Sequence, residues 1–157
     1  VLLTQARDSV VARAIAIDTS PVDVHGALTE IVAAVVPPDV PLALAVARAL
    51  VDVAAPLVLD RVVSNLLVNA MRYGEPPIVV RAAHDGEQLR ISGTDRGAGV
   101  PEELRPRLFE RFVRSEDVRG AGLGLSIARA YARAPGGDLV SAPGPGGRRF
   151  ELLVPAA

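Results

Sequence analysis

Two asparagines, Asn65 and Asn69, lie four residues apart in a segment that is otherwise mainly apolar. In a helix this spacing places both amides on one face, about 6 Å apart along the axis. A buried amide without a partner costs on the order of 1–3 kcal/mol, so the pair needs hydrogen-bonding partners or a ligand. Neighbouring backbone could supply the partners. Alternatively, the helix lines a pocket with polar contents, where an amide oxygen suits Mg²⁺.

A second candidate is Asp95, which directly follows the strand-like segment 89–94 and is followed by Gly97 and Gly99. A carboxylate fixed at the end of a strand can accept a hydrogen bond from an exocyclic amine, and glycines let the backbone pass close to a flat ring. An ordinary turn at the end of a strand would explain the same residues.

A third candidate is the alternation of Gly120, Gly122 and Gly124 at the start of a predicted helix. Backbone N–H groups and the positive end of the helix dipole could face an anion there. A flexible loop followed by the start of a helix would explain the same glycines. The spacing is not the dinucleotide fingerprint G-x-G-x-x-G. Between these glycines and Asp95 lies 108–114, LFERFVR, which we interpret as a hydrophobic plug that anchors a loop.

The remaining pattern predicts the elements that position these residues. Apolar residues at helical spacing predict a helix that starts after Pro56 and contains both asparagines. Two β-rich runs that flank His84-Asp85-Gly86 predict a hairpin, with Asp-Gly as the turn signal. We also expect a strand leading into a helix at 21–36, β-structure at 40–53, a helix at 121–134 and a closing hairpin at 136–155. The class is α/β, without regular βαβ units.

Composition limits the function. The chain has 157 residues, half of them hydrophobic, and a formal charge of −1, which argues against nucleic acid as the main partner. Cysteine is absent, which excludes disulfides and cysteine-bound metals. The longest apolar region, 31–50, is interrupted by prolines and charges, so we expect no membrane span and no direct membrane contact.

Four segments together resemble a known family. In order and spacing, LDRVVSNLLVNAMRYG, DRGAGVP, LFERFVR and GAGLGLSIARAYA resemble the asparagine, first glycine, phenylalanine and second glycine boxes of the sensor histidine kinase catalytic domain. That domain belongs to the GHKL superfamily and has the Bergerat fold. The resemblance implies a two-layer α/β sandwich. A mixed, mostly antiparallel sheet would pack against three main helices, with ATP held under a short lid.

The resemblance also implies roles for individual residues, by their position in the motifs. In the asparagine box, Asn69 would coordinate Mg²⁺ and Asn65 would support the metal–phosphate site. Arg72 would contact phosphate, and Tyr73 would pack near the nucleotide.

The other boxes would complete the nucleotide site. Asp95 would accept a hydrogen bond from the adenine amine, with Gly97 and Gly99 shaping the pocket. Arg114 is the candidate for contacting the γ-phosphate during transfer. The second glycine box would receive the phosphates, and its residues are Gly120, Gly122, Leu123 and Gly124.

The resemblance implies a domain plan and partners. Residues 1–19 would be the remnant of a preceding dimerisation helix and linker, and residues 20–157 the catalytic and ATP-binding domain. Neither His25 nor His84 has the context of a phosphoacceptor, so the acceptor histidine would lie on a dimerisation domain in the same protein or a separate chain. The domain would not autophosphorylate alone. A response regulator would act downstream, and we expect a cytoplasmic location, compatible with a membrane anchor elsewhere in the parent protein.

Three alternatives remain open. ATPases of the gyrase, chaperone or mismatch-repair type place a glutamate four residues before the metal asparagine, where this chain has Asn65, a neutral amide that cannot act as a base. A serine kinase of the anti-sigma-factor type shares the boxes but has another acceptor. A non-catalytic nucleotide-binding domain is the third alternative.

Overall fold

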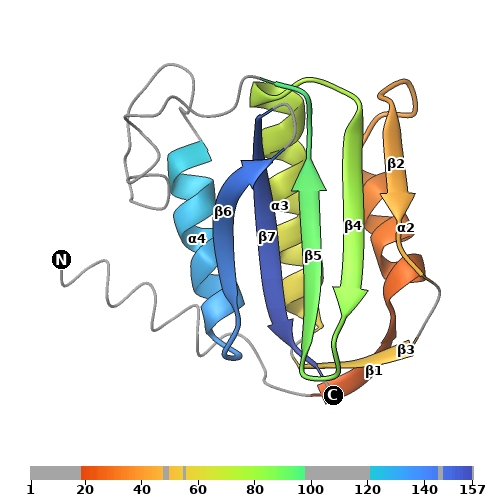
Figure 1. Ribbon diagram of the computed structural model, residues 1–157, viewed down its shortest axis with the longest axis vertical. Coiled ribbons are helices and arrows are strands. Elements are labelled where there is room, and N and C mark those ends of the chain that lie inside the picture. Colours follow the sequence, from red (N-terminus) through yellow and green to blue (C-terminus); the bar gives the residue numbers. More distant parts are fainter. Residues whose placement is uncertain (1–18, 48–49, 55, 98–120, 145–146, 157) are drawn as a thin grey trace, which may run out of the picture.

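The computed structural model describes residues 19–47, 50–54, 56–97, 121–144 and 147–156. In this part of the chain, helices α2 (Val24–Val35), α3 (Leu57–Tyr73) and α4 (Ala121–Arg133) cover one face of a five-stranded sheet (Figure 1). The expected two-layer α/β sandwich is confirmed. Residues 98–120, which include the phenylalanine box and the expected lid, and residues 1–18 lie outside the described residues.

The main sheet has the strand order β2-β4-β5-β7-β6. Strand β2 pairs with β4 in parallel, and the other neighbours are antiparallel, so the sheet is mixed and mostly antiparallel as expected. The parallel pair is possible because β3 and α3 lie between β2 and β4 in the chain and form the long connection that a parallel pair needs. The strands are β2 (Leu42–Ala45), β4 (Ile78–His84), β5 (Gln88–Thr94), β6 (Asp138–Gly144) and β7 (Gly147–Pro155).

A second sheet of two strands, β1 (Thr19–Asp23) and β3 (Leu50–Ala54), lies at the lower end of the main sheet in Figure 1. The segment 40–53, expected to be β-structure, therefore contributes to two sheets, through β2 and β3. Strand β1 begins at Thr19, paired with Ala54, which is one residue before the expected start of the domain.

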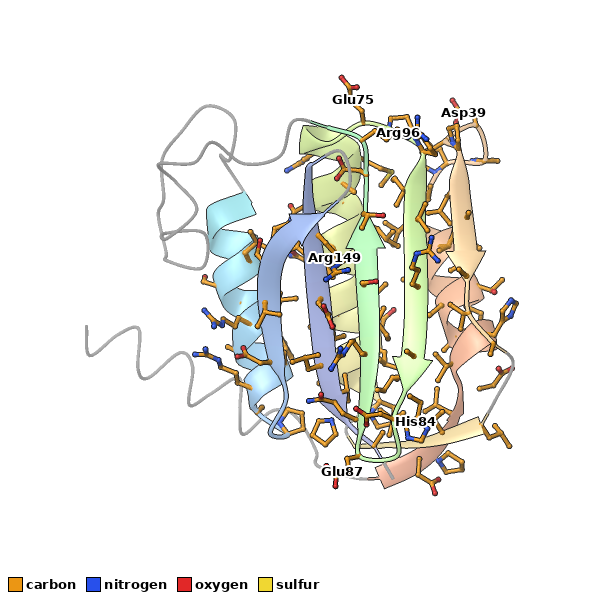
Figure 2. The ribbon with its side chains drawn as sticks, in the orientation of Figure 1. Asp39, Glu75, His84, Glu87, Arg96 and Arg149 are labelled. Atoms are coloured by element: carbon orange, nitrogen blue, oxygen red, sulfur yellow. The ribbon has the colours of Figure 1, made fainter. Side chains whose placement is uncertain are left out.

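The core lies between the main sheet and the helices. In β4, Ile78 and Val80 are buried while Arg81 is exposed, the alternation of a sheet with one solvated face. On that solvated face, Nε of Arg90 forms an ion pair with Oε1 of Glu151 at 2.9 Å. Arg149 lies on the same face of the sheet (Figure 2). Helix positions also contribute fully buried side chains to the core, among them Leu28, Leu59, Val62, Leu125 and Ala132.

The first hairpin turn lies close to where the sequence predicted it, but begins one residue later. The first hairpin was expected to turn at His84-Asp85-Gly86, but His84 is the last residue of β4 and the turn is Asp85–Glu87. Asp85 organises this turn, because its Oδ1 accepts hydrogen bonds from the N–H groups of Glu87 and Gln88. Gly86 has a φ of 95°, a conformation that favours glycine.

Three element ends meet at one end of the sandwich. Helix α3 ends, β5 ends and α4 begins toward the top of Figure 1, so the C-terminal half of α3, the residue after β5 and the first turn of α4 lie toward the same end of the sandwich. No helix among the described residues has the length and hydrophobicity that a membrane crossing requires.

Candidate functional site

Helix α3 presents the two asparagines at the border of its buried face. Val62, Leu66 and neighbouring apolar side chains are buried, whereas Asn65 and Asn69 are half-buried. The face therefore is not fully buried, contrary to what the apolar sequence around the two amides suggested. Arg72 follows three residues after Asn69, in the last turn of the helix, and is exposed. Because residues three and four apart share a helix face, the amides and the guanidinium form one polar strip.

The two amides are hydrogen-bonded to each other, with Nδ2 of Asn69 donating to Oδ1 of Asn65 at 3.1 Å. Their partner is thus another side chain, whereas the sequence suggested neighbouring backbone or a ligand. No partner is recorded for Oδ1 of Asn69 within the described part of the chain. A neutral oxygen held in this way fits Mg²⁺, which takes few protein ligands when phosphates and water supply the rest.

Among the described residues, a metal site formed by protein ligands alone is not found. In the described residues there is no group of three or more His, Cys, Asp or Glu side chains that could hold a metal ion. A fully protein-coordinated Ca²⁺ or Zn²⁺ site needs such a group, whereas Mg²⁺ bound together with phosphates does not.

Asp95 is anchored by its backbone surroundings at the end of β5. Its Oδ1 accepts hydrogen bonds from the N–H of Gly97 at 2.6 Å and from the N–H of Glu75 at 3.3 Å. The loop is tied back in the other direction, because the N–H of Arg96 donates to the carbonyl of Glu75 at 2.8 Å. Glu75 and Arg96 accordingly lie together at one end of the sheet (Figure 2).

Within the described part of the chain, this anchoring uses only one of the two acceptor atoms of Asp95. Both backbone donors use Oδ1, and no partner is recorded for Oδ2 within the described residues. The side chain is half-buried at a fixed place, so Oδ2 offers a directed carboxylate acceptor of the kind that an exocyclic amine requires.

Helix α4 packs beside α3 and contacts β6 and β7. It begins at Ala121, so Gly122, Leu123 and Gly124 fall in its first turn, where backbone N–H groups have no partners within the helix. The expected helix start for the second glycine box is confirmed. Its role in phosphate binding remains a prediction.

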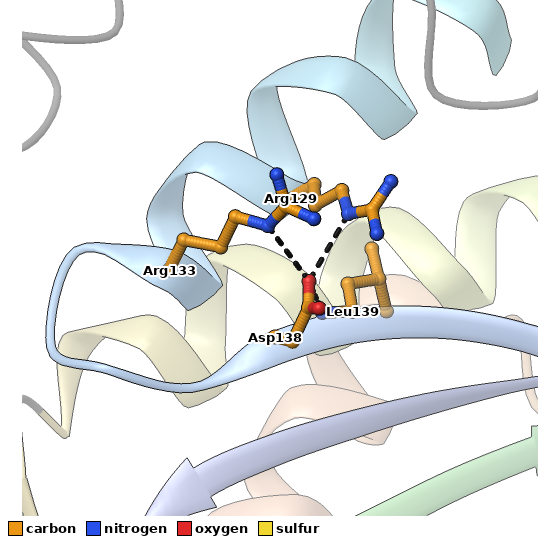
Figure 3. Close-up of polar contacts among 4 residues, drawn as sticks. All are labelled: Arg129, Arg133, Asp138 and Leu139. Carbon is orange, nitrogen blue, oxygen red and sulfur yellow. Dashed lines mark hydrogen bonds and ion pairs between the residues drawn. The ribbon is translucent and has the colours of Figure 1, made fainter.

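Asp138 holds α4 onto the sheet. This first residue of β6 accepts hydrogen bonds at Oδ1 from Nε of Arg129 and Nε of Arg133, each at 3.0 Å, and from the N–H of Leu139 at 2.8 Å (Figure 3). Partial burial by itself raises the pKa of Asp138. The two arginine hydrogen bonds and the backbone N–H outweigh it, so the pKa lies below its ordinary value.

Several predicted site residues cannot be placed. Gly99, Arg114 and Gly120 lie outside the described residues, as do the side chains of Tyr73 and Leu123. The sequence interpretation in turn missed Gly74, which packs against Asp95, and the Asp138 cluster. A signal for the cluster exists, because two arginines four residues apart on a helix precede an acidic residue that opens a strand.

Sequence comparison identifies the family. Residues 54–157 match the model of the family described as histidine kinase-, DNA gyrase B- and HSP90-like ATPase. The chain is 37% identical over 102 residues to the signal transduction histidine-protein kinase AfsQ2 of Streptomyces coelicolor, covering 62% of this chain and 19% of that protein. It is 41% identical over 95 residues to the sensor histidine kinase YkoH of Bacillus subtilis, and the match covers 56% of this chain and 21% of that protein. The chain thus spans about a fifth of the length of these two curated relatives.

Solved structures agree with the sequence comparison. The mycobacterial sensor histidine kinase MprB has a TM-score of 0.71 and 29% identity, with 88% of this chain and 98% of that chain covered. The ATP-binding domain of PrrB from Mycobacterium tuberculosis has a TM-score of 0.70 and 29% identity, with 89% and 98% covered. Together with the asparagine face, the anchored aspartate and the glycines that open α4, these similarities lead to one conclusion. The chain belongs to the histidine kinase-, DNA gyrase B- and HSP90-like ATPase family, as an ATP-binding catalytic domain of the sensor histidine kinase type.

Proposed function

We propose that this domain binds ATP together with Mg²⁺ at the end of the sandwich where α3 and β5 end. It would pass the γ-phosphate to a histidine on another domain or chain. The observation that carries the proposal is the amide pair on α3, in which Asn65 is a neutral partner of Asn69 and Oδ1 of Asn69 has no partner among the described residues.

Each part of the site would have a separate task. Oδ2 of Asp95 would accept a hydrogen bond from the adenine amine, and Oδ1 of Asn69 would bind Mg²⁺, whose charge offsets that of the phosphates. Arg72 and the N-terminus of α4 would add positive potential beside the phosphates. Arg114 and Gly99 would act on the γ-phosphate and the adenine pocket as the family motifs imply. Catalysis of this type rests on positioning and charge stabilisation.

The transfer step balances without a further reactant. The lone pair of an unprotonated ring nitrogen of the acceptor histidine attacks the γ-phosphorus, and a P–N bond forms. The bond from the γ-phosphorus to the bridging oxygen breaks, and ADP leaves with its electron pair.

The neutral amide at position 65 supports transfer to a protein over hydrolysis. Activating a water molecule needs a base within hydrogen-bonding reach, and an amide has no basic lone pair at neutral pH. Oδ1 of Asn65 is moreover occupied by the N–H of Asn69. At position 65 the site would thus lack the base that activates water.

The acceptor would come from outside this domain. His84 lies at the end of the sheet opposite Glu75 and Arg96 (Figure 2), and His25 is the second residue of α2. We therefore propose a dimerisation and phosphotransfer domain, in the same protein or a partner chain, and a downstream response regulator. The working location would be the cytoplasm.

The test is radioactive labelling from ATP carrying a labelled γ-phosphate, applied to the parent protein, to its Asn69→Ala variant and to this domain alone. The parent protein should acquire an acid-labile label, as phosphohistidine does, and Asn69→Ala should abolish it. The isolated domain should stay unlabelled. An acid-stable label would instead indicate a serine kinase, and phosphate release without any label would indicate an ATPase, so either result overturns the proposal.

A further inference from the structure

The chain makes a close contact just after the end of α3, at Gly74. The N–H of Gly74 donates to the carbonyl of Ala70 at 3.0 Å, as the last bond of the helix. Its φ of −102° and ψ of −169° are those of extended backbone, which any residue adopts. The backbone conformation therefore does not require glycine at this position.

The space in which a side chain at position 74 would begin is instead filled by the Asp95 carboxylate. For a Cβ atom built at position 74, the three nearest atoms all belong to the carboxyl group of Asp95, and Oδ1 would lie only 2.5 Å away. Real Cβ atoms essentially never approach another atom within 3.0 Å. Any side chain at position 74 would thus push the Asp95 carboxylate out of its place.

The carboxylate is confined on its other side as well. A Cβ at Gly97 would lie 2.9 Å from Oδ1 of Asp95 and 2.8 Å from the Cα of Gly74. The two glycines thus pack against each other around Asp95, while the N–H groups of Gly97 and Glu75 hold Oδ1. This arrangement fixes the direction in which Oδ2 points.

We infer that Gly74 is a specificity-determining residue for the purine base, because its missing side chain lets Asp95 occupy the position from which Oδ2 meets an exocyclic amine. Gly74 acts through Asp95 and is therefore a positioning residue. The inference rests on the proposed adenine role of Asp95. A side chain at position 74 would weaken discrimination of the base and leave the asparagine face and α4 in place.

The test compares the affinities for ATP and for inosine triphosphate, which carries a carbonyl oxygen in place of the amine. The domain should prefer ATP, because that oxygen would face the carboxylate acceptor. Gly74→Ala should lower the ratio of the two affinities by about ten-fold or more, mainly through weaker ATP binding. A ratio within about two-fold of the unsubstituted domain, in a folded variant, overturns the inference.

Gly26→Ala is the matched control. A Cβ at Gly26 would lie 2.6 Å from Oδ2 of Asp23, the residue that caps α2, so the variant makes the same steric conflict with an aspartate. Helix α2 starts away from the proposed nucleotide site, at the other end of the sandwich (Figure 1). Gly26→Ala should leave the ratio unchanged, and a ratio that fell as in Gly74→Ala would contradict a local effect.

A second measurement covers the case in which Gly74→Ala folds poorly. If the conflict is with the Asp95 carboxylate, Gly74→Ala should lower the melting temperature strongly in the native background and little in an Asp95→Ala background. An equal loss in both backgrounds overturns the inference. If instead the unsubstituted domain does not prefer ATP to inosine triphosphate, the proposed adenine role of Asp95 fails first, so the two failures are distinguishable.

Discussion

Asp95 has two carboxylate oxygens with different surroundings, and this difference gives the first prediction. Asp95→Asn can keep the hydrogen bonds from Gly97 and Glu75 through its remaining oxygen, but places an NH₂ donor where Oδ2 stood. Two donors then face each other when adenine binds. ATP affinity should fall about 10- to 100-fold, as expected for losing a hydrogen bond to a charged group.

Calorimetric titration of ATP measures this effect, and circular dichroism checks that the variant is folded. Asp52→Asn is the control, because Asp52 is an exposed residue of β3 and carries the same change away from the site. Equal ATP affinity for Asp95→Asn and the unsubstituted domain would exclude Asp95 from adenine recognition.

Among the residues, the sequence predicted the polar positions better than their contacts. Asn65, Asn69 and Asp95 could be singled out because polar residues at defined spacing stand out against an apolar pattern. The hydrogen bond between the two asparagines was not expected, since spacing does not say whether two amides turn toward each other. Gly74 was overlooked because a glycine after a helix is usually explained by a left-handed cap, and its actual reason is a contact with a residue 21 positions away.

At the scale of elements, the contacts of Asp138 make the attachment of α4 to the sheet depend on pH. Because its pKa in the folded domain is lowered, its contribution to stability is complete above the unfolded value of about 3.9 and is lost as pH falls through the folded value. Asp138→Asn should cost about 1 kcal/mol of unfolding free energy at neutral pH, a modest figure because Arg133 and Asp138 are partly exposed.

Urea unfolding between about pH 3 and pH 7 tests this prediction. The difference between the unsubstituted domain and Asp138→Asn should shrink as the pH falls below about 4. Asp39→Asn, in an exposed loop, should show no such difference. A stability difference that stays constant over the whole range would contradict the assigned role of the Asp138 carboxylate.

The connection from α4 to β6 leaves no room for a side chain at Gly137. A Cβ there would collide with the backbone carbonyl of Leu153 and lie 2.9 Å from the carbonyl of Ala132. Because backbone atoms cannot give way as a side chain can, Gly137→Ala should destabilise the domain by about 2 kcal/mol or more. Gly93→Ala is the control, since nothing lies within 4 Å of a Cβ built there. Similar melting temperatures for both variants would contradict this account.

The helices and hairpins could be predicted because their signals are local. Apolar residues at helical spacing indicated α3, and Asp85-Gly86 indicated the first hairpin. The order of the main sheet could not be predicted in the same way. Strand β5 pairs with β7, from Ile91 to Leu152, across a long stretch of chain, and such a pairing leaves no local pattern. For the sheet, only its mixed and mostly antiparallel character was expected, and that expectation came from the family resemblance.

In the whole molecule, the proposed ATP site depends on elements that are distant in sequence but end together. The asparagines come from α3, the adenine acceptor follows β5, and the glycines open α4, all at one end of the sandwich (Figure 1). Such a site forms only when the sheet and the helix layer are both in place. Nucleotide binding should therefore protect the domain as a unit against unfolding.

The most direct test of this site is the Mg²⁺ dependence of ATP binding, measured by calorimetry with Mg²⁺ and with a chelator. The unsubstituted domain should bind ATP about ten-fold or more tightly with Mg²⁺, because Oδ1 of Asn69, which has no partner among the described residues, would bind the ion. In Asn69→Ala the two affinities should become nearly equal, while Val68→Ala, an exposed neighbour, keeps the native ratio. An Asn69→Ala domain that is folded and retains the native Mg²⁺ dependence would contradict the account.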